Sequence, residues 1–204
     1  ADVNTRKYGF ELKASGARMG SKSHSPVNID MYIKDVLAKN EIKYSAKNCL
    51  GNEAAVTDTY SQLSSCMDPK LAFIEMMRAV FNQYTITTVV NGSNLKVNGY
   101  PDISCDIDDL YNKVFKNGKF VARSFKRVQG CIALSVYSHM EGWDYMMVFK
   151  GSDSKNVAER GDYFFISSDE AKDINDLYDD NRFNLSKGGK EDNFDKYSLL
   201  TSTR

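Results

Sequence analysis

At 204 residues the chain is long enough to bury a core without disulfides or metals, and it carries 27 basic and 27 acidic residues. A net charge of zero argues against a protein that binds polyanions with its whole surface, and no uninterrupted apolar run approaches the roughly 20 residues of a membrane span. We expect one α+β domain over residues 1–181, followed by a flexible tail or partner-binding arm at 182–204.

The first part of the chain gives three local signals of secondary structure. Residues 7–14 alternate between apolar and polar side chains, which predicts a strand. Residues 26–40 place apolar side chains at i, i+4, i+7 and i+8, which predicts a helix with one face turned to the core. Asn52 is a favourable N-cap residue, and it predicts a short helix that ends before Cys66.

The stretch from Asp68 to Val97 gives the clearest signal. Asp68 can accept a hydrogen bond from a free N–H group at a helix start, and Pro69 suits the first helical position. Apolar residues then cover most of the helix circumference, which predicts a central core helix over residues 68–84. β-Branched residues follow and lead to Asn91-Gly92, so a hairpin is expected there.

The second half of the chain predicts a sheet. Asp106 is expected to cap an amphipathic helix that ends at Asn117-Gly118. Beyond it, turn and loop residues, among them Gln129-Gly130 and the polar loop 151–161, separate four expected strands: Lys119–Val128, Cys131–Ser138, Trp143–Lys150 and Tyr163–Ser167. The fold class expected from all these elements is α+β, with one antiparallel sheet of about five to seven strands and helices packed mainly on one face.

Two further features concern the end of this region. The third expected strand carries large apolar side chains on one face, which we expect to be buried under a helix: Trp143, Tyr145, Met147 and Phe149. Ser167 and Glu170 have the spacing of a capping box, which predicts a last helix after them.

Two short stretches resemble each other, DIDDLYN at 106–112 and DINDLYD at 173–179. Each follows a strand-and-turn stretch, so one hypothesis is a duplicated unit of strand, hairpin and helix. The simpler hypothesis is that two capped amphipathic helices converged on similar residues. Duplication requires the two units to occupy equivalent places in one sheet and its helices.

The cysteines bear on the compartment of the protein. The chain has four cysteines, and their spacing is not that of a zinc site: Cys49, Cys66, Cys105 and Cys131. They therefore form either two disulfides or four buried thiols. Their even number and a start at Ala1 without methionine favour an exported protein, periplasmic or extracellular. In that case we expect Cys49 to pair with Cys66 and Cys105 with Cys131, because each bond would close a short loop.

One pair of residues is a candidate catalytic site. The chain has two histidines, His24 and His139, and His139 lies eight residues after Cys131. A thiolate beside an imidazole could attack an acyl or peptide bond, so this pair defines the alternative of a secreted cysteine-dependent hydrolase or toxin. No nucleophile signature surrounds Cys131, and a buried or disulfide-bonded cysteine is the simpler interpretation.

A basic segment is a candidate binding site. Between Asp109 and Glu141 the sequence has no acidic residue, but it has six basic ones interleaved with aromatic residues: Lys113, Lys116, Lys119, Arg123, Lys126 and Arg127. Such a pattern is typical of surfaces that bind nucleic acid or anionic lipid. The simpler interpretation is a solvated sheet face paired with the acidic region 153–180.

No catalytic, metal or nucleotide motif stands out, and we expect neither a metal site nor a cofactor. The leading hypothesis is an exported, non-enzymatic domain that binds another protein or takes part in an assembly. Its contact surface is expected along the aromatic-rich strand edges and the C-terminal tail. The cysteine-dependent hydrolase and the nucleic-acid binding protein are the two alternatives, and the sequence identifies no small-molecule ligand.

Overall fold

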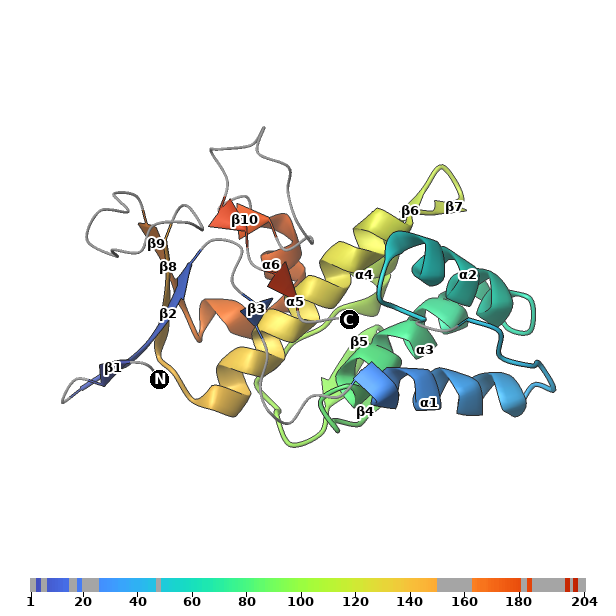
Figure 1. Cartoon of the computed structure of the whole chain (residues 1–204), viewed down its shortest axis with the longest axis horizontal. Helices are drawn as coiled ribbons and strands as arrows, with labels where there is room; N and C mark the ends of the chain where they lie inside the picture. The colour runs from blue at the N-terminus through green and yellow to red at the C-terminus, as the bar shows by residue number, and fades with distance from the viewer. Residues whose placement is uncertain are drawn as a thin grey trace.

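The computed structural model describes residues 3–4, 7–14, 18–19, 26–46, 49–149, 163–180, 183–184, 197–198 and 200–201. Figure 1 shows most of the helices gathered at one end of the molecule and a small sheet at the other. The described helices are α1 (Pro26–Ala38), α2 (Glu53–Ser64), α3 (Pro69–Asn82), α4 (Ile107–Val114), α5 (Ala122–Glu141) and α6 (Ile174–Asp179). A short 3-10 turn, η2 (Glu170–Lys172), directly precedes α6.

The largest sheet has four strands in the order β1 (Val3–Asn4), β2 (Gly9–Ala14), β8 (Tyr145–Phe149) and β9 (Tyr163–Ser167). β2 and β8 are parallel, and the other neighbours are antiparallel. Parallel strands need a long crossover connection, and here helices α1 to α5 supply it. Four separate two-stranded pairs complete the list of strands: β3 (Arg18–Met19) with β12 (Leu200–Thr201), β4 (Thr88–Asn91) with β5 (Asn94–Val97), β6 (Phe115–Lys116) with β7 (Lys119–Phe120), and β10 (Phe183–Asn184) with β11 (Tyr197–Ser198).

The predicted antiparallel sheet of five to seven strands is wrong. The segments 119–128 and 131–138, expected as two of its strands, form the short strand β7 and most of helix α5 instead. The apolar residues of this region recur at helical intervals of three and four, as Phe125, Val128 and Ile132 do. Gln129-Gly130, which was expected as a turn, lies inside the helix, and Gly142 ends it with a φ of 64°.

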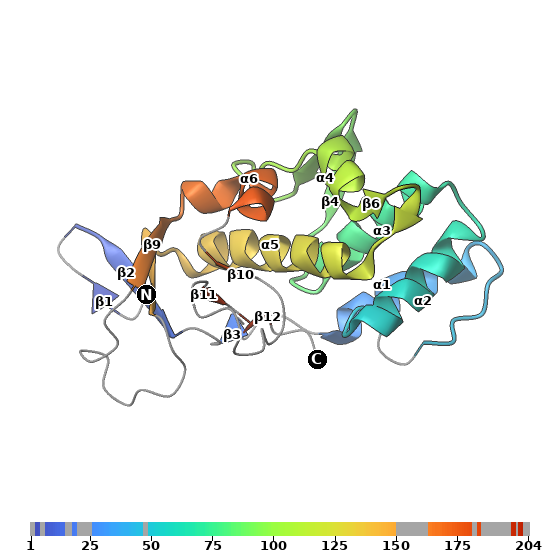
Figure 2. The ribbon, with the colours of Figure 1, turned by 90° about the horizontal axis from the view of Figure 1, so that it is seen from above.

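Helix α5 lies at the centre of the molecule. Every residue from Val128 to Ser138 is buried, because α2, α3, α4 and α6 all contact this helix. Figure 2 shows α5 running lengthwise with the other helices around it. The prediction that helix 68–84 would be the central one therefore needs correction: it is a core helix, but α5 is the one that neighbours surround.

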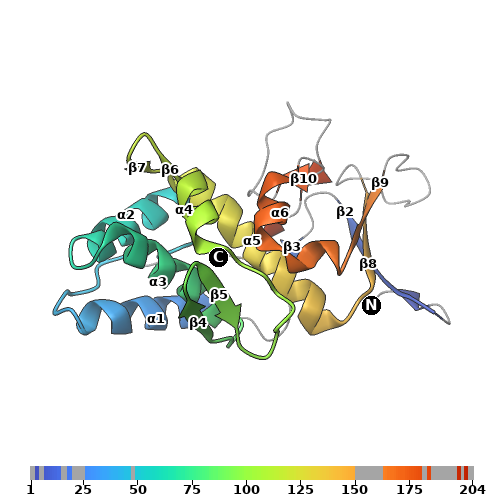
Figure 3. The same ribbon diagram turned by 180° about the vertical axis from the view of Figure 1, so that it is seen from behind.

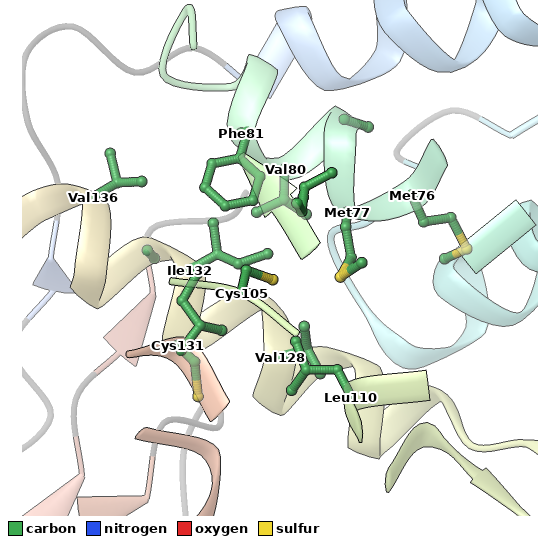
Figure 4. Close-up of a cluster of buried hydrophobic side chains, with 14 of the residues drawn as sticks. Met76, Met77, Val80, Phe81, Cys105, Leu110, Val128, Cys131, Ile132 and Val136 are labelled. Atoms are coloured by element: carbon green, nitrogen blue, oxygen red, sulfur yellow. The ribbon is translucent and has the colours of Figure 1, made fainter. Parts of the chain in front are cut away.

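Helix α3 confirms the strongest local prediction. Asp68 accepts hydrogen bonds from the N–H groups of Lys70 at 2.8 Å and Leu71 at 3.3 Å, and Pro69 occupies the first turn. The buried face of α3 includes Met77 and Phe81, which pack against α5 in the core shown in Figure 4. The hairpin expected after α3 is also confirmed, as the antiparallel pair β4–β5.

The two similar stretches build one hydrogen-bonded junction. Asp106 caps α4, and Asp173 caps α6. Asn175 joins the two helix starts, since its side chain accepts from the Asp106 N–H at 2.9 Å and donates to the Asp106 carbonyl at 3.0 Å and the Asp109 carboxylate at 2.7 Å. Residues near each cap also pair in parallel, with Ser104 opposite Asp173.

The strands that precede these two stretches do not support a duplication. β4 and β5, before the first stretch, form a two-stranded sheet of their own, whereas β8 and β9, before the second, belong to the four-stranded sheet. The two units therefore occupy different sheets. Convergence of two capped helices is the interpretation that fits the structure.

None of the described helices is long and apolar enough to cross a membrane. Most of the expected tail, 182–204, lies outside the described residues, as do the loop 151–161 and His24.

The core role of α3 predicts a clear contrast between two substitutions. Phe81→Ala should lower the free energy of unfolding by about 3–5 kcal/mol, because the ring is fully buried and a cavity would remain. Leu71→Ala on the same helix should cost less than about 1 kcal/mol, since Leu71 is 44% exposed. Urea denaturation followed by circular dichroism measures both, and equal losses would contradict the packing described.

The Asn175 junction predicts a second stability effect. Asn175→Ala should cost about 1–3 kcal/mol, because it leaves the Asp106 N–H and carbonyl groups without their side-chain partner in a partly buried position. Asn112→Ala is the matched control, since Asn112 is exposed on α4. The same urea titration measures both variants, and a loss no larger than that of the control would show that the junction adds little.

Candidate functional site

The four-stranded sheet has a buried face that contains an acid. Met146 of β8 and Ile166 of β9 are fully buried on this side. Glu11 of β2 lies beside them and is 5% exposed. The Tyr137 hydroxyl, from α5, donates a hydrogen bond to the Glu11 carboxylate at 2.6 Å. A hydrogen bond from helix α5 therefore satisfies the buried carboxylate of β2.

The opposite face of the sheet is apolar and aromatic. The strand register places Phe10 opposite Tyr145 and Met147 opposite Phe165, so all four share this face. The Phe10 and Tyr145 rings are stacked with centroids 5.6 Å apart, and Phe165 meets Phe10 edge to face at 6.3 Å. Phe165 is 37% exposed. We call Phe10, Leu12, Tyr145, Met147 and Phe165 the aromatic face.

No described helix covers the aromatic face. Figures 1 and 3 show the sheet at one end of the molecule, with the helices on one side of it. Tyr8 extends the face beyond the end of β2, because its ring meets Tyr145 edge to face at 5.7 Å. The Lys7 ammonium lies 4.9 Å from the centre of the Tyr8 ring and so borders this end of the face.

The sequence predicted the opposite orientation for this sheet. Trp143 is buried, but it precedes the strand, and the face of Tyr145 and Met147, which we expected to be buried under a helix, is half-buried and lies away from the described helices. β8 reads YMMVF, and a strand that is apolar on both sides cannot show which side will be covered. The sequence did not identify Phe10 and Phe165 as site residues. The alternation along β2 shows that Phe10 and Leu12 lie on the same side of the strand, but it does not show how exposed that side is.

The candidate catalytic pair does not come together. Cys131 is fully buried within α5, and burial raises the pKa of its thiol. His139 lies eight residues further along the same helix, a rise of about 12 Å. The His139 Nδ1 atom is 2.7 Å from the Ser135 carbonyl oxygen, so it donates to the backbone of its own helix. The structure therefore does not bring the Cys131 thiol and the His139 imidazole of the hydrolase alternative into contact.

The expected disulfides are wrong, because all four cysteines are free thiols. Cys49 and Cys66 lie on either side of α2, a 12-residue helix about 18 Å long, whereas bonded cysteines need Cα atoms within about 7 Å. Burial raises the pKa of the Cys105 thiol to about 12. Disulfides therefore do not support the expectation that the protein is exported.

Half of the basic segment holds the fold together. Lys113 forms ion pairs with Asp109 at 2.7 Å and Asp179 at 2.6 Å. Lys126 is buried, and its ammonium donates to the Leu50 carbonyl and to Gln129, both at 2.8 Å.

Arg127 has a similar structural role. Its guanidinium donates to the Tyr178 carbonyl at 2.7 Å and the Asp180 carbonyl at 3.0 Å, which ties α5 to the end of α6. The remaining three cations, Lys116, Lys119 and Arg123, are exposed at one end of the molecule. The predicted site is therefore reduced from six residues to three.

A groove of about 410 Å³ between α1 and α3 contains a nearly buried acid, Glu75. The Tyr32 hydroxyl donates to the Glu75 carboxylate at 2.5 Å, and Arg78 forms an ion pair with it at 3.0 Å. Burial, and secondly the bond to Glu75, raise the pKa of Tyr32. These two partners satisfy the Glu75 carboxylate, so its burial is explained by the structure without a ligand.

The acidic residues of α4 also have structural partners. Asp108 forms an ion pair with Lys70, and Asp109 pairs with Lys113 and accepts from Asn175. Within the described part of the chain, no group of three or more His, Cys, Asp or Glu side chains could hold a metal ion.

No family model matches this chain, and neither a curated protein nor a solved structure matches it. The candidate sites therefore depend on the geometry alone. The aromatic face is the larger of the two surfaces, and the three exposed cations form the smaller one.

The burial of the cysteines predicts their reactivity. With Ellman's reagent at pH 8, we expect the partly buried Cys66 to react first, because the thiols of Cys49, Cys105 and Cys131 are buried and have raised pKa values. Denaturation should then release four thiols in total. A Cys66→Ser variant is the control and should lose the first reaction. A total of two thiols, or a fast reaction of Cys131, would contradict this structure.

Proposed function

We propose that the protein is a non-enzymatic assembly domain, and that its aromatic face binds the same face of a second copy of the chain. The observation that supports this proposal is the orientation of β2. Its acid, Glu11, points to the side that α5 covers, whereas Phe10 and Leu12 lie on the opposite side and are half-buried. A strand with one solvated face normally has the reverse arrangement.

The inverted strand has an energetic consequence. Burying a large apolar side chain stabilises a protein by roughly 1.5–3 kcal/mol, and Phe10 and Leu12 gain only part of that in the isolated chain. A shift of the pairing register by one residue would exchange the two faces of β2. The hydrogen bond from the Tyr137 hydroxyl favours the observed register, because it holds Glu11 on the inner side.

A second copy is the partner that fits the charge of this face. None of the five side chains that define the aromatic face is charged, so the faces themselves would bring no like charges together. The chain as a whole also has no net charge, which removes long-range repulsion between copies at neutral pH. Two sheet faces pack with their side chains interdigitated at a separation of about 10 Å.

The ring geometry supports the same role. Stacked and edge-to-face rings hold one another in place, so little side-chain entropy remains to be lost on binding. Aromatic residues and methionine are also the residue types enriched at protein interfaces. A two-fold dimer would use each of these side chains twice.

Sedimentation velocity between about 5 and 200 μM tests the proposal. The wild-type sedimentation coefficient should rise with concentration. Phe165→Asp should weaken self-association by roughly 100-fold, because a symmetric dimer would bury two new carboxylates and lose two apolar contacts. Val89→Asp is the matched control, since Val89 is 52% exposed on β4, outside the four-stranded sheet, and it should associate like wild type.

Two results would contradict the assembly proposal. One is a wild-type protein that stays monomeric over the whole concentration range. The other is an equal loss of association in Phe165→Asp and Val89→Asp. Circular dichroism of both variants separates a lost interface from a lost fold.

A further inference from the structure

The β6–β7 hairpin places two lysines side by side at its tip. Lys116 and Lys119 are direct partners across the two strands. Asn117 and Gly118 form the turn between them, with φ values of 53° and 72°, as a tight hairpin turn requires. Like charges at opposed positions destabilise an antiparallel pair. No carboxylate in the described part of the chain forms an ion pair with either lysine to relieve this repulsion.

An aromatic cluster fixes the base of the hairpin. Phe115 and Phe120 pair across the strands, with ring centroids 5.7 Å apart. The Phe120 ring stacks on Tyr60 of α2 at 4.0 Å, and the Phe115 ring stacks on Tyr111 of α4 at 4.2 Å. Figures 1 and 3 show the hairpin projecting beyond these helices. The two lysines therefore extend from a rigid base.

Arg123 adds a third cation next to the hairpin. The Val121 N–H donates to the Val114 carbonyl at 3.0 Å, which closes the hairpin and leads directly into α5. Arg123 is exposed in the first turn of α5, and this turn contains no acidic residue. We call Lys116, Lys119 and Arg123 the cationic hairpin.

We propose that the cationic hairpin binds the backbone phosphates of a nucleic-acid strand. Opposed strand residues lie about 5 Å apart at Cα, so their flexible ammonium groups can reach neighbouring phosphates of one strand. An anionic ligand would also relieve the repulsion between Lys116 and Lys119. This proposal does not depend on self-association through the aromatic face.

A nucleic acid fits this surface better than a membrane does. The large apolar side chains that are exposed lie elsewhere in the described structure: Tyr8, Val27, Met31, Leu71, Val89, Val90 and Phe165. A segment that binds a lipid surface stably buries apolar side chains in it, and the rings of the hairpin are already stacked on one another.

Fluorescence anisotropy with labelled single-stranded and duplex oligonucleotides tests the proposal over a series of salt concentrations. Three phosphate contacts predict a slope of log K against log salt of about −2 for a single strand and about −2.7 for a duplex. Affinity for the single strand should fall about 20-fold between 50 and 200 mM salt. The triple variant Lys116→Gln, Lys119→Gln, Arg123→Gln should lose at least about tenfold in affinity at 50 mM salt, with a slope near zero.

A second triple variant, Lys39→Gln, Lys43→Gln, Lys96→Gln, is the matched control. It removes the same net charge from exposed positions outside the cationic hairpin and should stay within about twofold of wild type. Thermal unfolding of the first triple variant should be unchanged or shifted upward, because it removes the repulsion between the two lysines.

Four outcomes would overturn the proposal. Wild-type protein that does not bind either oligonucleotide at 20 mM salt is the first, and an equal loss of binding in both triple variants is the second. The third is that the protein binds phosphatidylserine vesicles as tightly as it binds the oligonucleotides at equal charge. The fourth is that it binds polyglutamate as tightly as the oligonucleotides at equal charge. Each of the last two would assign the cationic hairpin to another kind of anion.

Discussion

The fold depends on the burial of α5 from Val128 to Ser138 on every side. A helix without a solvent face needs neighbours all around it, and α2, α3, α4 and α6 provide them. One polar group that this burial includes, the Lys126 ammonium, is satisfied locally by bonds to Gln129 and to the Leu50 carbonyl, whereas the Ser135 hydroxyl and the Gln129 amide nitrogen have no hydrogen-bond partner in the described structure. Basic residues that look like a binding surface in the sequence are thus partly the means by which α5 is held in place.

The sequence located the elements whose ends depend on a single side chain. Asn52, Asp68 and Asp106 each accept a hydrogen bond at the helix start where they were expected. It failed for α5, because a helix buried all around has no polar stripe and its apolar run resembles buried strands. It also could not predict the pairing of β2 with β8, since the choice between distant strands depends on the whole chain.

The aromatic face of the sheet shows the same limit at the candidate site. Alternation along β2 predicts that Phe10 and Leu12 are buried and that Glu11 is solvated, yet the Tyr137 hydroxyl of α5 holds Glu11 inside. The face that is covered therefore depends on a tertiary contact. The aromatic face and the cationic hairpin lie near opposite ends of α5, as Figure 2 shows. Two copies joined through their sheets would direct their hairpins away from each other.

The parallel pairing of β2 with β8 also governs when the sheet can form. The two strands are joined by contacts between residues 135 positions apart, such as the bond from the Gly9 N–H to Asp144. At a synthesis rate of about 5–20 residues per second, β2 waits about 7–27 s for its partner. Throughout that time a strand with Phe10 on one side has an unpaired edge, and a nascent chain nearby offers the same edge. The order of synthesis thus leaves β2 exposed to mispairing until β8 has been made.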